Sequence, residues 1–142
     1  MRPVEMIPIG AHSEIKIPMA EALVAAGFPS PADDTINSRL DLNELLVDHP
    51  AATFFVRVQG QSMLEANIHS GDTLIVDRSL EARDGKIVVA VIGGEFTVKR
   101  LKIDGKRMTL LPENPAYPVL EVPPGMDLEI WGVVTYVIHP AR

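Results

Sequence analysis

Beyond residue 50 the chain is a series of short apolar runs separated by turn residues. The runs are rich in Val, Ile, Leu and Phe, and Gly, Pro or Asp stands between most of them. This pattern predicts a mainly β domain of the barrel or sandwich type, because the helices that alternate with strands in a parallel sheet are missing from it. The predicted strands are residues 53–59, 73–77, 86–92, 95–102, 107–111, 118–121 and 127–138.

The N-terminal residues differ from this pattern and predict an extended arm. Prolines and a glycine interrupt the segment, and the alternating run 13–17 is typical of a strand that pairs with a sheet edge. Residues 18–26 predict a short helix, with a proline near its start and a glycine after its end. We therefore divide the chain into an arm at 1–39 and a compact domain at 40–142.

A second short helix is predicted where the arm joins the domain. Asp41 has the position of an N-cap, and Glu44 follows it by three residues as in a capping box. Leu42, Leu45 and Leu46 give this helix one apolar side.

Composition excludes several classes of protein. The chain has 142 residues, of which 46% are hydrophobic, and this suits one domain with an arm. It contains no cysteine, so disulfides, zinc–thiolate sites and a cysteine nucleophile are excluded. The net charge of −6 argues against a general nucleic-acid binder, and the basic residues between 99 and 107 predict a solvated hairpin edge. Without a membrane span or a continuous apolar leader, we expect a soluble, cytoplasmic protein.

The tetrapeptide Gly60-Gln61-Ser62-Met63 is the first candidate for chemistry. It follows the apolar run 54–58, and a glycine at a strand end permits a tight turn that lifts the serine hydroxyl out of the sheet. The backbone N–H groups of Gln61 and Ser62 then suit an oxyanion, while Ser62 suits a nucleophile. The same residues also fit an ordinary polar turn.

Lys99 is the candidate base for this serine. The sequence Ile92-Gly93-Gly94-Glu95 predicts a hairpin with a two-residue turn, which sets Val88 opposite Lys99 and places Lys99 on a mostly apolar face. A free lysine is neutral in only about one molecule in 2,500 at pH 7, and burial lowers its pKa. The alternative is a strand lysine whose amine reaches water.

The remaining candidates concern the bond that is cut and the histidines. Small residues flank the Ala26–Gly27 bond, which suits a tight cleft, although Gly27 also fits the end of a helix. The four histidines are predicted to be surface or structural residues, since none stands in a triad or metal-site pattern. We expect no metal and no cofactor. The histidines are His12, His49, His69 and His139.

These motifs together resemble the LexA/UmuD family of self-cleaving Ser-Lys peptidases. The resemblance covers most of the chain, with its motifs in the same order. It rests on Ala26-Gly27-Phe28-Pro29-Ser30-Pro31, Leu40-Asp41-Leu42-Asn43, Leu45-Leu46, His49-Pro50, Gly60-Gln61-Ser62-Met63, Gly71-Asp72, Leu74-Ile75-Val76-Asp77, Gly94-Glu95-Phe96-Thr97-Val98-Lys99 and Gly132-Val133-Val134.

The resemblance implies a fold and a function. The fold is a compact peptidase domain of short, highly twisted strands with one short helix and an extended N-terminal arm. Ser62 is the nucleophile, Lys99 the general base and acid, and Ala26–Gly27 the bond that the protein cuts in itself. A RecA filament on single-stranded DNA stimulates the cut during the SOS response. The shortened form is a homodimer that serves as accessory subunit of an error-prone Y-family (UmuC-like) translesion polymerase.

Two limits accompany this resemblance. About 40 residues precede the core, broken by Pro and Gly, so the helix-turn-helix domain of LexA is not expected, nor is direct sequence-specific DNA binding. The alternative function is a non-catalytic polymerase-accessory protein with a vestigial Ser-Lys site. A weaker alternative is a processing peptidase that acts on other proteins.

Overall fold

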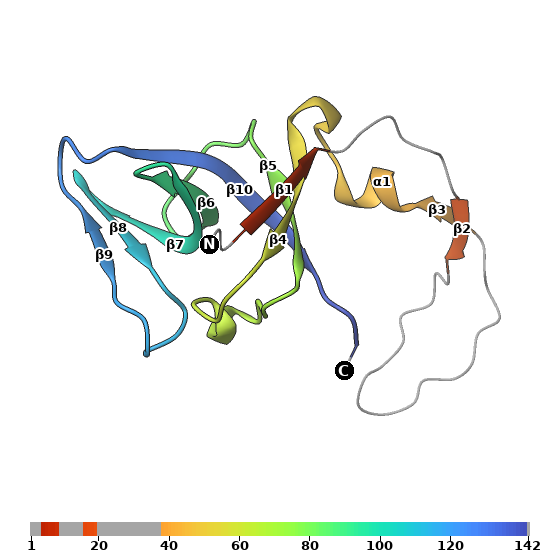
Figure 1. The fold of residues 1–142 in the computed structure, drawn as a ribbon. Helices are drawn as coiled ribbons and strands as arrows, with labels where there is room; N and C mark the ends of the chain where they lie inside the picture. The colour runs from red at the N-terminus through yellow and green to blue at the C-terminus, as the bar shows by residue number, and fades with distance from the viewer. Residues whose placement is uncertain (1–3, 9–15, 20–37, 142) are drawn as a thin grey trace. The chain divides into compact units, whose positions relative to one another are not determined.

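The computed structural model describes residues 4–8, 16–19 and 38–141 (Figure 1). Contacts between Cα atoms divide the described residues into two units. The first contains residues 4–8 and 49–141, and the second contains residues 16–19 and 38–48.

The first unit is built on one antiparallel sheet of eight strands, which confirms the predicted mainly β fold. Most predicted strands agree with the observed ones within two residues, and β9 begins two residues later than expected, after Pro118. In sheet order the strands are β1 (Val4–Pro8), β4 (Thr53–Val58), β5 (Thr73–Asp77), β10 (Leu128–Ile138), β6 (Ile87–Ile92), β7 (Glu95–Asp104), β8 (Arg107–Leu111) and β9 (Leu120–Val122). Short 3₁₀ turns lie at η1 (Pro50–Ala52) and η2 (Leu64–Ala66).

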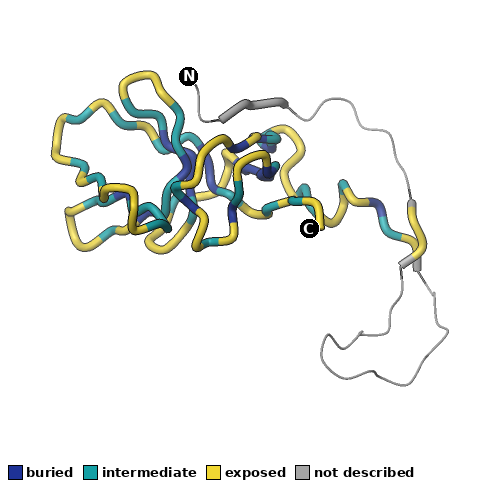
Figure 2. The backbone as a smooth tube through the Cα atoms, turned by 60° about the horizontal axis from the view of Figure 1, so that its bottom comes forward, coloured by how far each residue is buried: buried dark blue, intermediate teal, exposed yellow. Residues whose placement is uncertain are grey.

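Two apolar clusters form the core, and both include residues of the central strand β6. Val89 belongs to the cluster that also contains Met63, while its neighbours Val88 and Ala90 belong to the second cluster. Alternate side chains of a strand point to opposite faces, so β6 is covered on both sides. Figure 2 shows this buried backbone at the centre of the unit. The clusters are Val56, Val58, Met63, Ile68, Leu74, Val76, Val89 and Val98, and Val88, Ala90, Leu101, Leu110 and Val133.

Strand β10 is irregular where it carries the only tryptophan of the chain. Its register against β6 shifts between Ile130 and Gly132, so Trp131 is an extra residue in the ladder. A bulge of this kind bends the strand and increases its twist. Trp131 makes edge contacts with Phe54 and Phe96, so it packs within the fold.

The second unit is a two-stranded ribbon followed by a helix. β2 (Lys16–Met19) pairs antiparallel with β3 (Ser38–Asp41), and α1 (Leu42–Leu46) follows directly. Asp41 accepts a hydrogen bond from the backbone N–H of Asn43 at 3.0 Å, which confirms the predicted cap. Leu42 and Leu45, the predicted apolar side of this helix, are exposed.

The helix predicted to begin at Pro18 is wrong at its start. Pro18 and Met19 lie in β2, because Pro18 takes an edge position opposite Arg39, where proline without an N–H is tolerated. Residues 20–26 of that prediction lie outside the described residues. Within the described part of the chain, no helix is long and apolar enough to cross a membrane.

Candidate active site

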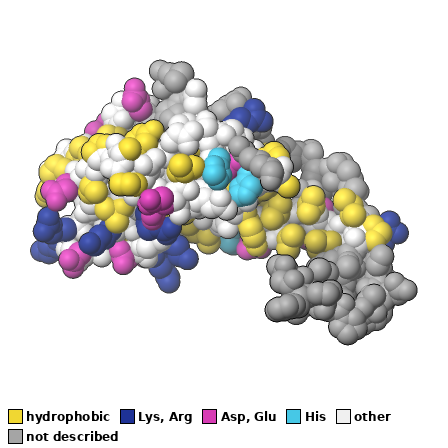
Figure 3. Space-filling view, turned by 90° about the horizontal axis from the view of Figure 1, so that it is seen from below, with side chains coloured by type: hydrophobic (Ala, Val, Ile, Leu, Met, Phe, Trp, Pro, Cys, Tyr) yellow, Lys and Arg dark blue, Asp and Glu magenta, His cyan; other side chains and the backbone are white. Residues whose placement is uncertain are grey.

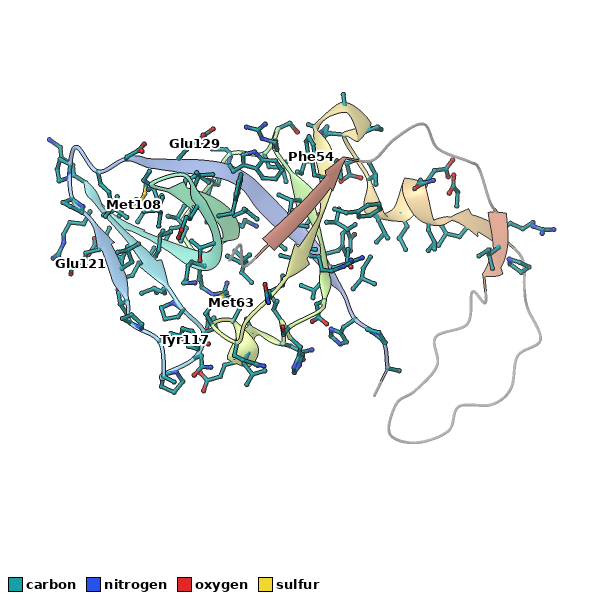
Figure 4. The ribbon with its side chains drawn as sticks, in the orientation of Figure 1. Phe54, Met63, Met108, Tyr117, Glu121 and Glu129 are labelled. Carbon is teal, nitrogen blue, oxygen red and sulfur yellow. The ribbon has the colours of Figure 1, made fainter. Side chains whose placement is uncertain are left out.

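A tight turn after β4 carries Ser62. Gly60 adopts a φ of 104°, which favours glycine, and its N–H donates to the Ser70 hydroxyl at 3.2 Å. Met63, labelled in Figure 4, follows the serine and is 2% exposed. Its carbonyl accepts the N–H of Ala66 at 3.0 Å and of Ile68 at 3.2 Å. The buried methionine therefore fixes the turn to the core while Ser62 stays half-buried beside it.

Lys99 comes from the middle of β7, and the predicted hairpin sets its position. Gly93 and Gly94 both have positive φ, as a two-residue hairpin turn requires. The register puts Val88 opposite Lys99 and Ala90 opposite Thr97, as predicted from the sequence.

The two side chains meet across 37 residues of sequence. The Lys99 Nζ donates to the Ser62 Oγ at 3.0 Å, to the Thr97 Oγ1 at 2.8 Å and to the Val98 carbonyl at 3.1 Å. Burial lowers the pKa of Lys99 below its ordinary value, because the ammonium loses water in this environment. The contact therefore joins a hydroxyl to an amine whose neutral form is favoured, which is what proton abstraction from a serine requires.

Two backbone N–H groups next to the Ser62 hydroxyl are unpaired in the part of the chain that the structure describes. Among the described residues, the N–H groups of Gln61 and Ser62 donate no hydrogen bond. A small pocket lies beside Ser62, and its lining is Val58, Gln59, Gly60, Ser62, Met63, Thr97 and Val98. Free N–H groups next to a nucleophile can stabilise the negative charge that develops on a carbonyl oxygen under attack.

A third segment, between β8 and β9, holds the serine turn in place. The Glu113 N–H donates to the Ser62 carbonyl at 2.8 Å, and the Glu113 carbonyl accepts the N–H of Glu65 at 2.7 Å. The Asn114 Nδ2 donates to the Gln61 carbonyl at 2.8 Å. The Glu113 carboxylate in turn accepts a hydrogen bond from the Arg100 Nε.

This connection links the turn back to β7. Arg100 directly follows Lys99, and its Nη1 also donates to the Gly85 carbonyl at 2.7 Å. We call Arg100 and Glu113 the brace. The sequence did not identify the brace, since residues 112–125 gave only an irregular, proline-rich signal and long-range pairing leaves no local pattern.

The predicted cleavage bond and one histidine lie outside the described residues, namely Ala26, Gly27 and His12. A second histidine, His49, contacts Asp77 at 2.6 Å. Burial alone would raise the Asp77 pKa, but hydrogen bonds from Ser79 and His49 lower it below its ordinary value. His49 therefore has a structural partner, as predicted.

The other two histidines also have partners away from the serine. His69 contacts Asn67, and His139 lies 3.4 Å from Asp72. Within the described part of the chain, no histidine hydrogen bonds to Ser62, and no cluster of metal-ligating side chains occurs.

The predicted basic edge is divided in the structure. Lys99 and Arg100 are engaged in the site, whereas Lys106 and Arg107 are exposed at the β7–β8 turn. Arg107 also pairs with Glu121 at 3.3 Å. Figure 3 shows basic and acidic side chains interspersed on this face, so it lacks the continuous positive charge of a nucleic-acid surface.

A mainly β domain that brings a serine against a desolvated lysine has the character of a serine peptidase. The Peptidase S24-like family matches residues 18–135 of the chain. The protein MucA of Escherichia coli is 48% identical over 134 residues, which cover 92% of this chain and 91% of MucA. The protein SamA of Salmonella typhimurium strain LT2 is 52% identical over 117 residues, covering 82% of this chain and 81% of SamA.

A LexA repressor is more distantly similar. The LexA repressor of Acidovorax is 39% identical over 133 residues, which cover 94% of this chain but 58% of the repressor. The chain belongs to the Peptidase S24-like family, that is, to the serine peptidases of the LexA/UmuD type.

Proposed function

We propose that this protein cuts its own Ala26–Gly27 bond with Ser62 as nucleophile and Lys99 as general base and acid. The observation that carries the proposal is the 3.0 Å contact from the Lys99 Nζ to the Ser62 Oγ, made by an amine whose pKa burial lowers. A lysine that is neutral at the working pH can accept the hydroxyl proton, whereas an ammonium cannot.

The steps follow from these atoms. Neutral Lys99 takes the proton of the Ser62 hydroxyl as the Oγ attacks the carbonyl carbon of Ala26. The oxyanion is held by the N–H groups of Gln61 and Ser62. The C–N bond breaks as Lys99 gives its proton to the amine of Gly27, and water then hydrolyses the ester and restores Ser62. The apolar side chains of the pocket beside Ser62 suit a residue as small as Ala26.

The biological role follows from the family resemblance. A RecA filament on single-stranded DNA stimulates the cut in the SOS response, in the cytoplasm. The shortened product forms a homodimer and serves as accessory subunit of an error-prone Y-family polymerase. The similarity to MucA and SamA over most of each chain supports this role.

Intact mass measured over a series of pH values tests the chemistry. The purified chain is incubated between about pH 7 and about pH 10, where a lysine with a lowered pKa becomes neutral. Fragments 1–26 and 27–142 are expected to form faster as pH rises, by about tenfold per unit below the Lys99 pKa. Ser62→Ala and Lys99→Ala abolish them, whereas Lys102→Ala, at an exposed lysine of the same strand, leaves them unchanged.

Two results separate this proposal from its alternatives. A chain that stays intact at every pH is next incubated with RecA, ATP and single-stranded DNA, and no cut there either identifies a non-catalytic accessory protein. A cut that survives Ser62→Ala shows that Ser62 is not the nucleophile.

A further inference from the structure

Strand β4 has two neighbours, and one of them belongs to the N-terminal segment (Figure 1). β1 pairs with β4 over five residues, from Val4 opposite Val58 to Pro8 opposite Phe54. On its other side β4 pairs with β5. β1 is the last strand of this sheet, so among the described residues the backbone groups on that edge of β4 pair with no strand other than β1.

The proposed cut changes how that segment is held. Scission after residue 26 leaves β1 on the smaller product and β4 on the larger one. The two products are then held together only by non-covalent pairing. β1 pairs with β4, and β2 pairs with β3 over four residues in the second unit. Two-stranded ribbons of this size are marginally stable on their own.

We propose that the edge of β4 is a docking site for an extended segment of a partner protein, which β1 occupies until the chain is cut. The proposal rests on the proposed function for the event that opens the site. Loss of β1 leaves a row of N–H and C=O groups without a partner on β4, and an unpaired edge of this kind accepts an added strand.

The register of β1 indicates which segment fits. Glu5 lies opposite Arg57, and Met6 lies opposite Val56. Arg57 is exposed, whereas Val56 and Val58 are buried in the core. A strand added to this edge therefore needs an acidic residue opposite Arg57 and apolar residues on either side of it.

The cut also changes the competition between β1 and a partner. In the intact chain β1 is covalently joined to β4, and such a link gives an effective concentration of up to about a millimolar. After the cut the tether is lost, and at about 1 µM protein the fragment competes at a concentration up to about a thousandfold lower. The β2–β3 pairing retains part of this advantage, so we expect a partner segment to bind at least about tenfold more tightly after the cut.

The test uses the full chain and does not depend on self-cleavage. A Ser62→Ala chain receives the recognition sequence of a foreign site-specific protease between residues 20 and 37, and it is examined before and after that protease cuts it. The probe is a fluorescently labelled peptide of residues 1–12, and binding is followed by anisotropy. A matched peptide carries Glu5→Lys, and a matched chain carries Arg57→Glu.

The expected result is at least about tenfold tighter binding of the probe to the cut chain than to the uncut chain. Glu5→Lys in the peptide weakens binding, and Arg57→Glu in the chain restores it, because the two residues lie opposite each other. The proposal is overturned if the probe binds the cut and the uncut chain equally, or if it does not bind the cut chain. Dimerisation of the cut chain that excludes the probe also overturns it. A chain that fails to cut itself yet shows this exchange contradicts the proposed function and supports the docking site.

Discussion

Replacing Lys99 by methionine, which removes the proposed base, is expected to favour the folded state more at neutral pH than at high pH. Burial lowers the Lys99 pKa in the folded state, so between that pKa and its ordinary value near 10.5 the unfolded chain binds more protons than the folded one. At every pH below its folded-state pKa, the lysine therefore lowers the free energy of unfolding. This loss of stability disappears as the pH rises towards the pKa of the lysine in the unfolded chain. Methionine does not titrate and keeps a similar apolar stem.

The magnitude follows from the same linkage. Each unit by which the pKa is lowered corresponds to about 1.4 kcal/mol of lost stability at low pH. Against this, the substituted side chain would lack the hydrogen bonds that Lys99 donates to the Thr97 hydroxyl and to the Val98 carbonyl, at about 1 kcal/mol each. Any change in these hydrogen bonds as the amine loses its proton is already contained in the folded-state pKa, so the difference between two pH values reports the titration of Lys99.

Urea unfolding at about pH 7 and about pH 10 measures the free energy of unfolding at the two pH values. Every chain also carries Ser62→Ala, so that it stays intact. The free energy of unfolding of Lys99→Met relative to its parent is expected to be larger at the lower pH, by at most about 1.4 kcal/mol per unit of pKa lowering, because part of the cost remains at about pH 10. Lys102→Met is the matched control, because Lys102 lies exposed on the same strand and should show no such change. If Lys99→Met and its parent change in parallel with pH, Lys99 is solvated and the reasoning fails.

Two further substitutions test the brace and the core. Arg100→Gln should slow scission by about tenfold to a hundredfold while leaving the pH midpoint in place, because it loosens Glu113 and not the base. Mass spectrometry measures the rate of fragment formation, with Lys102→Gln as the control. A shifted pH midpoint would contradict a positioning role for Arg100. Gly132→Ala should destabilise the fold by about 1–3 kcal/mol, since the new Cβ would lie 2.6 Å from Val76 Cγ1. Thermal unfolding checks it, and an unchanged midpoint would show that β10 relaxes freely.

Local features of the structure could be predicted from the sequence. The Gly93-Gly94 turn set the β6–β7 register, and that register put Lys99 on the face of Val88. Asp41 identified the start of α1 in the same way. Turn and cap chemistry acts within a few residues, so a single sequence contains all the information that it requires.

Contacts between distant segments could not be derived in this way. The pairing of Ser62 with Lys99 was expected from family resemblance and not from periodicity, since 37 residues separate the two. The helix predicted at 18–26 was contradicted at Pro18, because pairing with β3 prevailed over the local helical signal. The brace was missed altogether, because Glu113 acts mainly through its backbone and no side-chain pattern marks it.

The site shows why two adjacent cations of one strand have different chemistry. Lys99 and Arg100 are neighbours on β7, and alternation sends their side chains in opposite directions. Lys99 is directed to the hydroxyls of Ser62 and Thr97, where loss of water favours its neutral amine. Arg100 reaches the same turn through the carboxylate of Glu113. Exchanging the two residue types would therefore remove both the proposed base and the brace, because an arginine cannot become a neutral base and a lysine cannot make the two directed contacts of Arg100.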